Sequence, residues 1–199
     1  MAGRRRESFA EARERRAAVD DPALVLEAAA RFLEARSRSI DEVRRRLTGA
    51  GYQAGLVDGA IVRLTELGML DDEVFARSWV ESRDRSRPRG ERAIRDELRR
   101  KGVDRALVDE VLEARRQAAA DADANAGVES DAGPAVSADR AAADRLLARH
   151  ARALARVAEP RQRRQRAYGL LARHGFDPDT CREAAIAMID SQTDDTAPG

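Results

Sequence analysis

Apolar residues recur with helical spacing in three segments of the chain that share one pattern. The segments are SIDEVRRRLTGAGYQAGLVDGAIVRL from Ser39, GERAIRDELRRKGVDRALVDEVLEAR from Gly90 and RRQRAYGLLARHGFDPDTCREAAIAM from Arg163. The second copy lies 51 positions after the first, and the third lies 73 positions after the second. Self-similarity of this kind predicts a chain built from repeated structural modules.

Each copy has the pattern of two helices joined by a tight turn. In the first copy, Val43 and Leu47 are four positions apart on one helical face, and Gly51 follows them. Gly102 and Gly175 occupy the equivalent place in the other copies. Glycine is the residue that most readily takes the left-handed conformation after a helix, so the first helix of each copy is predicted to end there. A second apolar stripe follows each glycine and predicts the second helix.

A third helix is expected to cover the apolar face that two such helices leave open. In the second copy this helix is predicted to follow Gly68, where two aspartates place negative charge at a helix N-terminus. Phe75 and Trp79, the only Trp of the chain, then fall on one apolar stripe. Residues 22–33 and 139–154 supply the covering helices of the other copies. The predicted core of the second module has seven side chains: Phe75, Trp79, Ile94, Leu98, Val103, Val108 and Leu112.

These patterns predict an all-α protein of three tandem three-helix repeats in an elongated modular arrangement. The expected order is a disordered basic extension, two repeats, a flexible acidic Ala-rich linker, a third repeat and a disordered tail. The segments span residues 1–20, 21–67, 68–116, 117–138, 139–191 and 192–199. The linker is inferred because the segment contains acidic residues, glycine and alanine but no basic residue and little apolar bulk.

Composition narrows the class of protein. Charged residues make up 37% of the chain and aromatic residues only 4%, which suits helices with narrow apolar stripes. The 37 basic residues nearly balance the 36 acidic ones, so net charge alone does not indicate nucleic-acid binding. A single cysteine excludes an intramolecular disulfide framework and fits a reducing cytoplasm. No apolar run approaches the roughly 18 residues of a membrane span, so the expected location is cytoplasmic, with no membrane partner.

Sequence patterns of an enzyme are weak. The three glycines within residues 49–55 connect two predicted helices, follow no strand and lack the Lys-Ser/Thr ending of a phosphate-binding loop. His150 and His174 are far apart in sequence, and Cys181 occupies a core-facing position. These placements argue against a zinc site or a Cys–His nucleophile. We expect no catalytic activity, no metal and no cofactor.

The three copies, with LGMLDDEVFARSWVESR, RPRGERAIRDELRRKGVD and RSIDEVRRRLTGAGY, resemble the RecX family of bacterial RecA regulators. The resemblance covers roughly residues 24–189 apart from the linker. It implies a non-enzymatic regulator that binds RecA and RecA filaments on single-stranded DNA. It further implies inhibition of recombinase ATPase, strand exchange and coprotease activity, and hence a role in homologous recombination, DNA repair and the SOS response. We expect a monomer, and leave open direct contact with single- or double-stranded DNA.

Basic residues supply the candidate contacts. Residues 83–101 hold nine basic residues against four acids, which we take as the strongest local excess of positive charge. A second basic cluster lies at residues 44–46. The candidate RecA- or DNA-contacting residues are Arg44, Arg45, Arg46, Arg83, Arg87, Arg89, Arg92, Arg95, Arg99, Arg100 and Lys101. A solvated helical face with internal Glu–Arg pairs would explain part of the same pattern.

Two other functions fit the same pattern. A helix, a tight turn and a second helix within a three-helix module also describe helix-turn-helix transcription regulators. Such a protein would bind duplex DNA with sequence preference, usually as a dimer. The other possibility is a helical scaffold that binds a partner unrelated to RecA.

Overall fold

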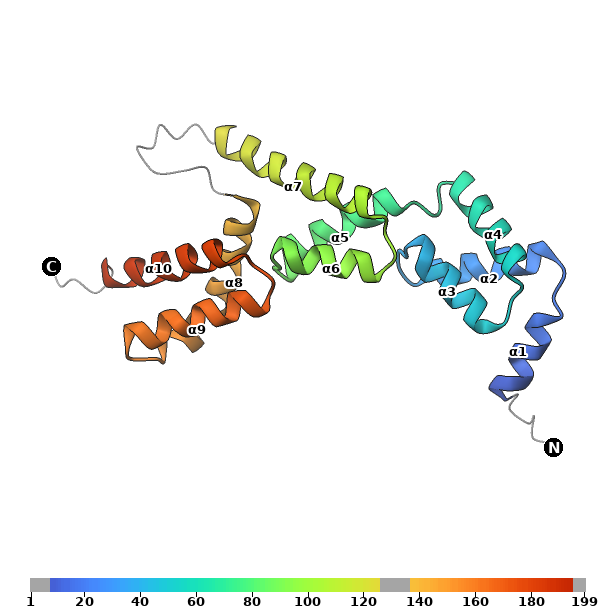
Figure 1. Ribbon diagram of the computed structural model, residues 1–199, viewed down its shortest axis with the longest axis horizontal. Coiled ribbons are helices and arrows are strands. Elements are labelled where there is room, and N and C mark those ends of the chain that lie inside the picture. Colours follow the sequence, from blue (N-terminus) through green and yellow to red (C-terminus); the bar gives the residue numbers. More distant parts are fainter. Residues whose placement is uncertain (1–7, 126–136, 195–199) are drawn as a thin grey trace. The chain divides into compact units, whose positions relative to one another are not determined.

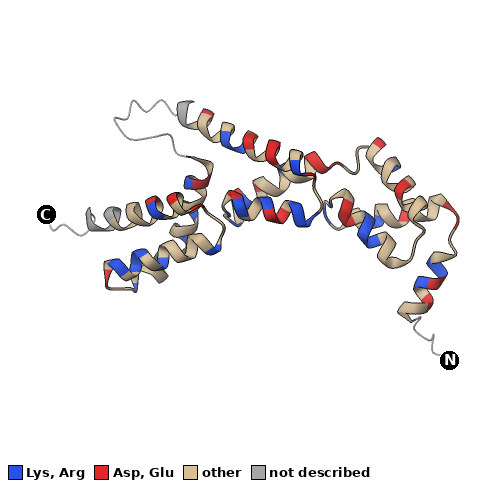
Figure 2. Ribbon diagram, viewed as in Figure 1, with Lys and Arg blue, Asp and Glu red and all other residues tan. Residues whose placement is uncertain are grey.

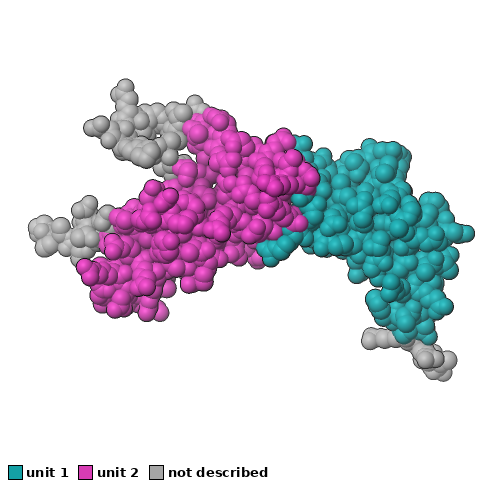
Figure 3. All heavy atoms as spheres, in the orientation of Figure 1, with its two compact units in different colours: residues 1–75, 100–103 teal, residues 76–99, 104–199 magenta. Residues whose placement is uncertain are grey.

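The computed structural model describes residues 8–125 and 137–194, and within these ranges it contains ten α-helices and no strand (Figure 1). The all-α prediction is confirmed. The chain divides into two compact units, coloured separately in Figure 3. The first comprises residues 1–75 and 100–103, and the second comprises residues 76–99 and 104–199. Within the described ranges, no helix is both long enough and apolar enough to cross a membrane.

The first unit is built around three helices. They are α2 (Pro22–Glu34), α3 (Ile40–Ala50) and α4 (Ala54–Glu66), and α2 packs against both of the others. Their shared core consists of small and medium apolar side chains, all nearly or fully buried: Val25, Ala29, Val43, Leu47, Val57, Ala60, Ile61, Leu64 and Leu70. The apolar spacing that predicted the first helical pair therefore corresponds to a packed core.

Helix boundaries in this unit follow local capping chemistry. Ser39 and Glu42 form the reciprocal capping box that starts α3, since each side chain accepts the other's backbone N–H. Helix α3 ends at Gly51, whose φ is 108°. The other glycines in the left-handed region are Gly68, Gly102 and Gly175. All four were predicted to end helices from the sequence, and the prediction is confirmed.

A helix within residues 1–20 was not expected. The structure places α1 at Phe9–Ala17, with a capping box between Ser8 and Glu11. The side-chain amide of Gln53 donates to the carbonyls of Ala17 and Val19, both at 3.2 Å. The expectation of a disordered extension is therefore wrong for residues 9–17, because a capped helix is attached to α4 by hydrogen bonds. Residues 1–7 lie outside the described ranges.

The remaining helices are α5 (Asp72–Ser86), α6 (Glu91–Arg100), α7 (Arg105–Asn125), α8 (Ala138–Ala155), α9 (Pro160–Arg173) and α10 (Pro178–Asp194). Six of the seven predicted core residues of the second repeat are buried: Phe75, Ile94, Leu98, Val103, Val108 and Leu112. Trp79 differs, because it is only partly buried. The core formed by α8, α9 and α10 uses smaller side chains, among them Ala142, Ala167, Cys181 and Ala184.

The predicted linker is shorter than expected. Helix α7 continues to Asn125, so residues 117–125 are helical. Alanine has the highest helix propensity, and Gln117 donates a hydrogen bond to Asp121 one turn later, which favours this extension. Residues 126–136 lie outside the described ranges. Helix α8 begins at Ala138 with Ser137 as its N-cap.

Candidate partner-binding surfaces

The start of α6 depends on a close backbone approach at Gly90, within the second unit. The N–H of Gly90 donates to the carbonyl of His174 at 3.0 Å. A Cβ atom at position 90 would lie 2.3 Å from the carbonyl oxygen of Gly175, which no side chain can tolerate. Glycine therefore allows the turn before α6 to pack directly on the turn between α9 and α10.

Among the predicted contact residues of segment 83–101, three are exposed arginines that make no ion pair with another described residue: Arg87, Arg92 and Arg99. Arg92 and Arg99 lie seven positions apart on α6 and therefore share one face. Ile94 and Leu98 are completely buried and turn the other side of the same helix inward. Within this segment, these three arginines are available to a partner without loss of an internal ion pair.

Two other predicted arginines surround Glu97. Arg83 donates through Nε to Oε2 of Glu97 at 2.6 Å, and Arg89 Nε lies 3.9 Å from Oε1. The indole N–H of Trp79 donates to the same Oε2 at 2.8 Å, and the Arg83 guanidinium lies 4.2 Å from the Trp79 ring centre. Trp79 was predicted to be a core residue. It lies instead at the edge of the core, because its N–H is bonded to a carboxylate and its ring face is covered by a cation.

Arg95 is also engaged internally. It donates to Glu91 at 2.8 Å and to Asp109 on α7 at 3.2 Å, and its side chain is 26% exposed. Glu91 accepts a second ion pair from Arg116 at 2.5 Å. Although burial acts to raise it, these hydrogen bonds lower the pKa of Glu91. Arg95 therefore joins α6 to α7 rather than pointing freely into solvent.

In the first unit, two arginines of the α3 cluster have acidic partners. Arg44 lies 3.2 Å from Asp58 of α4, and Arg45 lies 2.7 Å from Asp41. The Arg44 and Arg45 side chains are about half exposed, and pairs of this kind contribute little to stability. Their guanidinium groups can therefore exchange partners at small cost.

The other basic residues of this unit have different environments. Lys101 Nζ pairs with Glu42 at 3.1 Å, and both side chains are largely buried. The guanidinium of Arg46 lies 5.7 Å from the ring centre of Phe32. Arg100 is exposed, and its carbonyl accepts a hydrogen bond from Arg45 at 3.1 Å. Lys101 thus stabilises the α3 start, whereas Arg46 and Arg100 lie nearer the surface.

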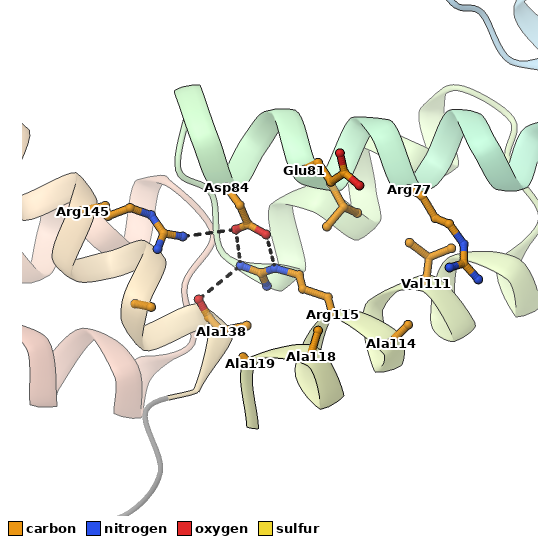
Figure 4. A pocket seen from close by; sticks show the side chains of 12 residues that line it. Arg77, Glu81, Asp84, Val111, Ala114, Arg115, Ala118, Ala119, Ala138 and Arg145 are labelled. Atoms are coloured by element: carbon orange, nitrogen blue, oxygen red, sulfur yellow. Dashed lines mark hydrogen bonds and ion pairs between the residues drawn. The ribbon is translucent and has the colours of Figure 1, made fainter. Parts of the chain in front are cut away.

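The sequence interpretation missed a buried arginine in the second unit. Arg115, on α7, donates from Nε and Nη2 to Asp84 of α5 at 3.0 and 2.8 Å (Figure 4). From Nη1 it donates to Asp139 of α8 at 2.6 Å. Its side chain is only 5% exposed. Although burial acts to lower it, the bonds to Asp84 and Asp139 raise the pKa of Arg115, which stays charged. Asp139 also accepts the backbone N–H of Glu91 at 2.9 Å.

A cavity of about 430 Å³ lies beside this network. Figure 4 shows Arg77 and Glu81 of α5, Arg145 of α8 and several alanines at its edges. Its polar groups are mainly engaged in joining α5, α7 and α8, so the cavity shows no unpaired reactive group. We assign this region a structural role.

The largest excess of basic residues lies outside the predicted set. Residues 149–166 contain seven arginines against one acid, an excess of six in 18 residues, whereas residues 83–101 have an excess of five in 19. The prediction that residues 83–101 hold the strongest local excess was therefore wrong. Figure 2 shows the basic positions concentrated along α9. The signal was available in the run RQRRQR that starts this helix, but it was interpreted only as part of the repeat.

The histidines and the cysteine make no reactive centre in the described residues. Cys181 is buried, its Sγ lies 3.7 Å from the carbonyl oxygen of Phe176, and burial raises the pKa of its thiol. For His174, burial has the opposite effect and lowers the pKa of the imidazole, whose Nδ1 lies 2.8 Å from the Leu170 carbonyl oxygen. No group of three or more His, Cys, Asp or Glu side chains within the described ranges could hold a metal ion.

Comparison with known protein families identifies two segments of the chain. Residues 71–112 match the second three-helix domain of RecX, and residues 138–185 match its third three-helix domain. A solved structure of RecX from Lactobacillus salivarius has the same fold, with a TM-score of 0.65 over 86% of this chain and 98% of that one. The two sequences are 19% identical.

Curated relatives match over greater lengths. The regulatory protein RecX of Mycobacterium sp. (strain JLS) is 38% identical over 146 residues, which cover 73% of this chain and 71% of that protein. The corresponding protein of Mycobacterium ulcerans is 31% identical over 164 residues, or 82% of this chain and 84% of the relative. These relatives are described as regulatory proteins, which agrees with the expectation of a protein that is not an enzyme.

Proposed function

Because this chain belongs to the RecX family of regulatory proteins, we propose that it binds RecA and RecA filaments on single-stranded DNA. Binding reduces the ATPase, strand-exchange and coprotease activities of the filament. The site of action is the cytoplasm, where RecA is found, and the active form is a monomer. The three-repeat division suits a partner that is itself repetitive, since tandem modules can contact successive subunits.

The observation that best supports binding at α6 is the pair of exposed arginines Arg92 and Arg99 on one face of that helix. Arginine forms two-point contacts with carboxylates and with phosphates, so this face suits an acidic RecA surface or a DNA backbone. Arg87, in the turn before α6, has the same exposure. Arg83, Arg89 and Arg95 are less suited, because each already forms an internal ion pair.

The test is filament binding by the double variant Arg92→Glu/Arg99→Glu. Purified RecA is assembled on single-stranded DNA, and the amount of this protein that sediments with the filaments is measured. Reversal of both charges is expected to weaken binding at least tenfold, with the helical circular dichroism and the melting temperature unchanged. The variant Arg31→Glu/Arg63→Glu, which changes net charge equally at exposed positions of α2 and α4, serves as the control.

Unchanged filament binding by the α6 variant would remove this face from the proposed site. An absence of any binding by the wild-type protein, together with sequence-dependent binding to duplex DNA, would favour a helix-turn-helix transcription regulator instead.

A further inference from the structure

Helix α9 carries a basic face that the α6 proposal does not use. Arg161, Arg164 and Arg166 are exposed, and within the described chain none of them forms an ion pair. They lie at i, i+3 and i+5, so the first two are neighbours on the helix surface. The guanidinium groups of these arginines repel one another, and an anionic ligand bound between them would reduce that repulsion.

The acids nearest to this face are already engaged. The two carboxylate oxygens of Glu159 accept the backbone N–H groups of Arg161 and Gln162 at 3.0 and 2.7 Å, which caps the start of α9. Asp179 pairs with Arg182 at 2.6 Å, but both side chains are more than 60% exposed. An exposed pair of this kind is weak, so Arg182 can turn to another anion.

A groove of about 670 Å³ is lined by both basic and apolar side chains. It lies between α9 and α10, and its lining combines Arg161, Arg164 and Arg182 with Tyr168 and Ile186. Tyr168 is 37% exposed and Ile186 is 39% exposed. The groove therefore presents guanidinium groups and a partly exposed aromatic side chain together.

We propose that the α9–α10 groove is a direct binding site for single-stranded nucleic acid. Arg161, Arg164 and Arg182 bind successive backbone phosphates, and a base packs on the ring of Tyr168 beside Ile186. The site belongs to helices α9 and α10 and does not involve RecA.

The partly exposed Tyr168 and Ile186 distinguish this ligand from an acidic peptide or a duplex. An acidic peptide would use the arginines but would gain little from an exposed aromatic ring. The bases of a duplex are stacked on one another and are not available to Tyr168, whereas those of a single strand are. Phosphates also match the two-point geometry of arginine.

The test measures binding of the full-length protein to fluorescent oligothymidylate by anisotropy, without RecA. The variant Arg161→Glu/Arg164→Glu is expected to lose at least tenfold in affinity. Tyr168→Ala is expected to lose roughly tenfold, since one stacked base is removed. Tyr168→Phe should bind within twofold of wild type because the ring is kept. If three phosphates are neutralised, log K should fall with log salt at a slope of about −2.

Several results would overturn the proposal. One is unchanged affinity in the α9 double variant, and another is an equal loss in the control Arg31→Glu/Arg63→Glu. A duplex that binds as tightly as the single strand and ignores Tyr168→Ala would also contradict it, as would polyglutamate that competes as well as unlabelled oligothymidylate. Loss of binding confined to Arg92→Glu/Arg99→Glu would move the site to α6. Circular dichroism of each variant establishes that it is folded, and the absence of RecA separates this test from that of the proposed function.

Discussion

Arg115 of α7 and Asp84 of α5 form a two-point ion pair, with Nε and Nη2 of the guanidinium donating to the two carboxylate oxygens at 3.0 and 2.8 Å. The third donor of the guanidinium, Nη1, reaches Asp139 at the start of α8. One side chain of α7 is therefore bonded to both α5 and α8, within a single compact unit.

Replacement of Arg115 by Leu should destabilise the second unit strongly. The change leaves Asp84 and Asp139 without their main counter-charge, and removal of one member of a buried ion pair costs about 3–5 kcal/mol. Urea unfolding monitored by circular dichroism measures the loss. Arg105→Leu on the same helix, where the side chain is 81% exposed, should change the free energy of unfolding by less than about 0.5 kcal/mol. Equal effects from the two substitutions would contradict the assigned role of Arg115.

Gly90→Ala should loosen the contact between the turn before α6 and the turn after α9. The new Cβ atom would meet the carbonyl of Gly175 at 2.3 Å, so the backbone must shift and the hydrogen bond to His174 weakens. Overpacking of this kind costs about 1–3 kcal/mol. Thermal unfolding should show a lower melting temperature. Gly59→Ala provides the control, because a Cβ atom there meets nothing within 4 Å. A melting temperature as high in Gly90→Ala as in Gly59→Ala would show that the close approach is not required.

Trp79→Phe isolates the hydrogen bond to Glu97. The ring stays apolar, but the indole N–H at 2.8 Å from Oε2 is lost. Hydrogen bonds to charged groups contribute about 1.5–3 kcal/mol, and Glu97 keeps Arg83, so a loss near the lower limit is expected. Urea unfolding gives the value. A loss of about 3–5 kcal/mol, as for a fully buried aromatic side chain, would return Trp79 to the core.

Glu91→Gln should change the pH dependence of stability. The Arg116 and Arg95 partners hold the pKa of Glu91 below its ordinary value despite its burial. Its ionised form therefore contributes stability above the unfolded pKa of about 4.3, and this contribution is lost as pH falls through the lower folded pKa. At neutral pH the variant should be less stable than wild type by about 1.5–3 kcal/mol. The difference should disappear in acid. A difference that persists at low pH would show that the ion pairs are not its source.

Local signals in the sequence predicted much of the fold. The left-handed glycines were identified because each depends only on the residues of the helix that it ends. A local signal of this kind, the capping pair Ser8 and Glu11, was also present near the N-terminus, but the segment was expected to be a disordered chain end, and α1 was missed. Its attachment through Gln53 joins positions far apart in sequence, so no local pattern indicated it.

The candidate contacts were harder to predict, because charge alone does not reveal which arginines have internal partners. Arg92 and Arg95 are both arginines of the same predicted helix, but only Arg95 forms an ion pair with Asp109 of the next helix. Arg115 was overlooked for the same reason, since Asp84 and Asp139 lie 31 and 24 positions away from it. Partners at such separations are set by packing between helices.

The central proposal is regulation of RecA, and the most direct measurement is the single-stranded-DNA-dependent ATPase of the cognate RecA. This protein is added at less than one molecule per RecA subunit, as wild type and as Arg92→Glu/Arg99→Glu. The account predicts substoichiometric inhibition by the wild-type protein and much weaker inhibition by the variant. An ATPase rate and a filament length that do not change with added wild-type protein would contradict it.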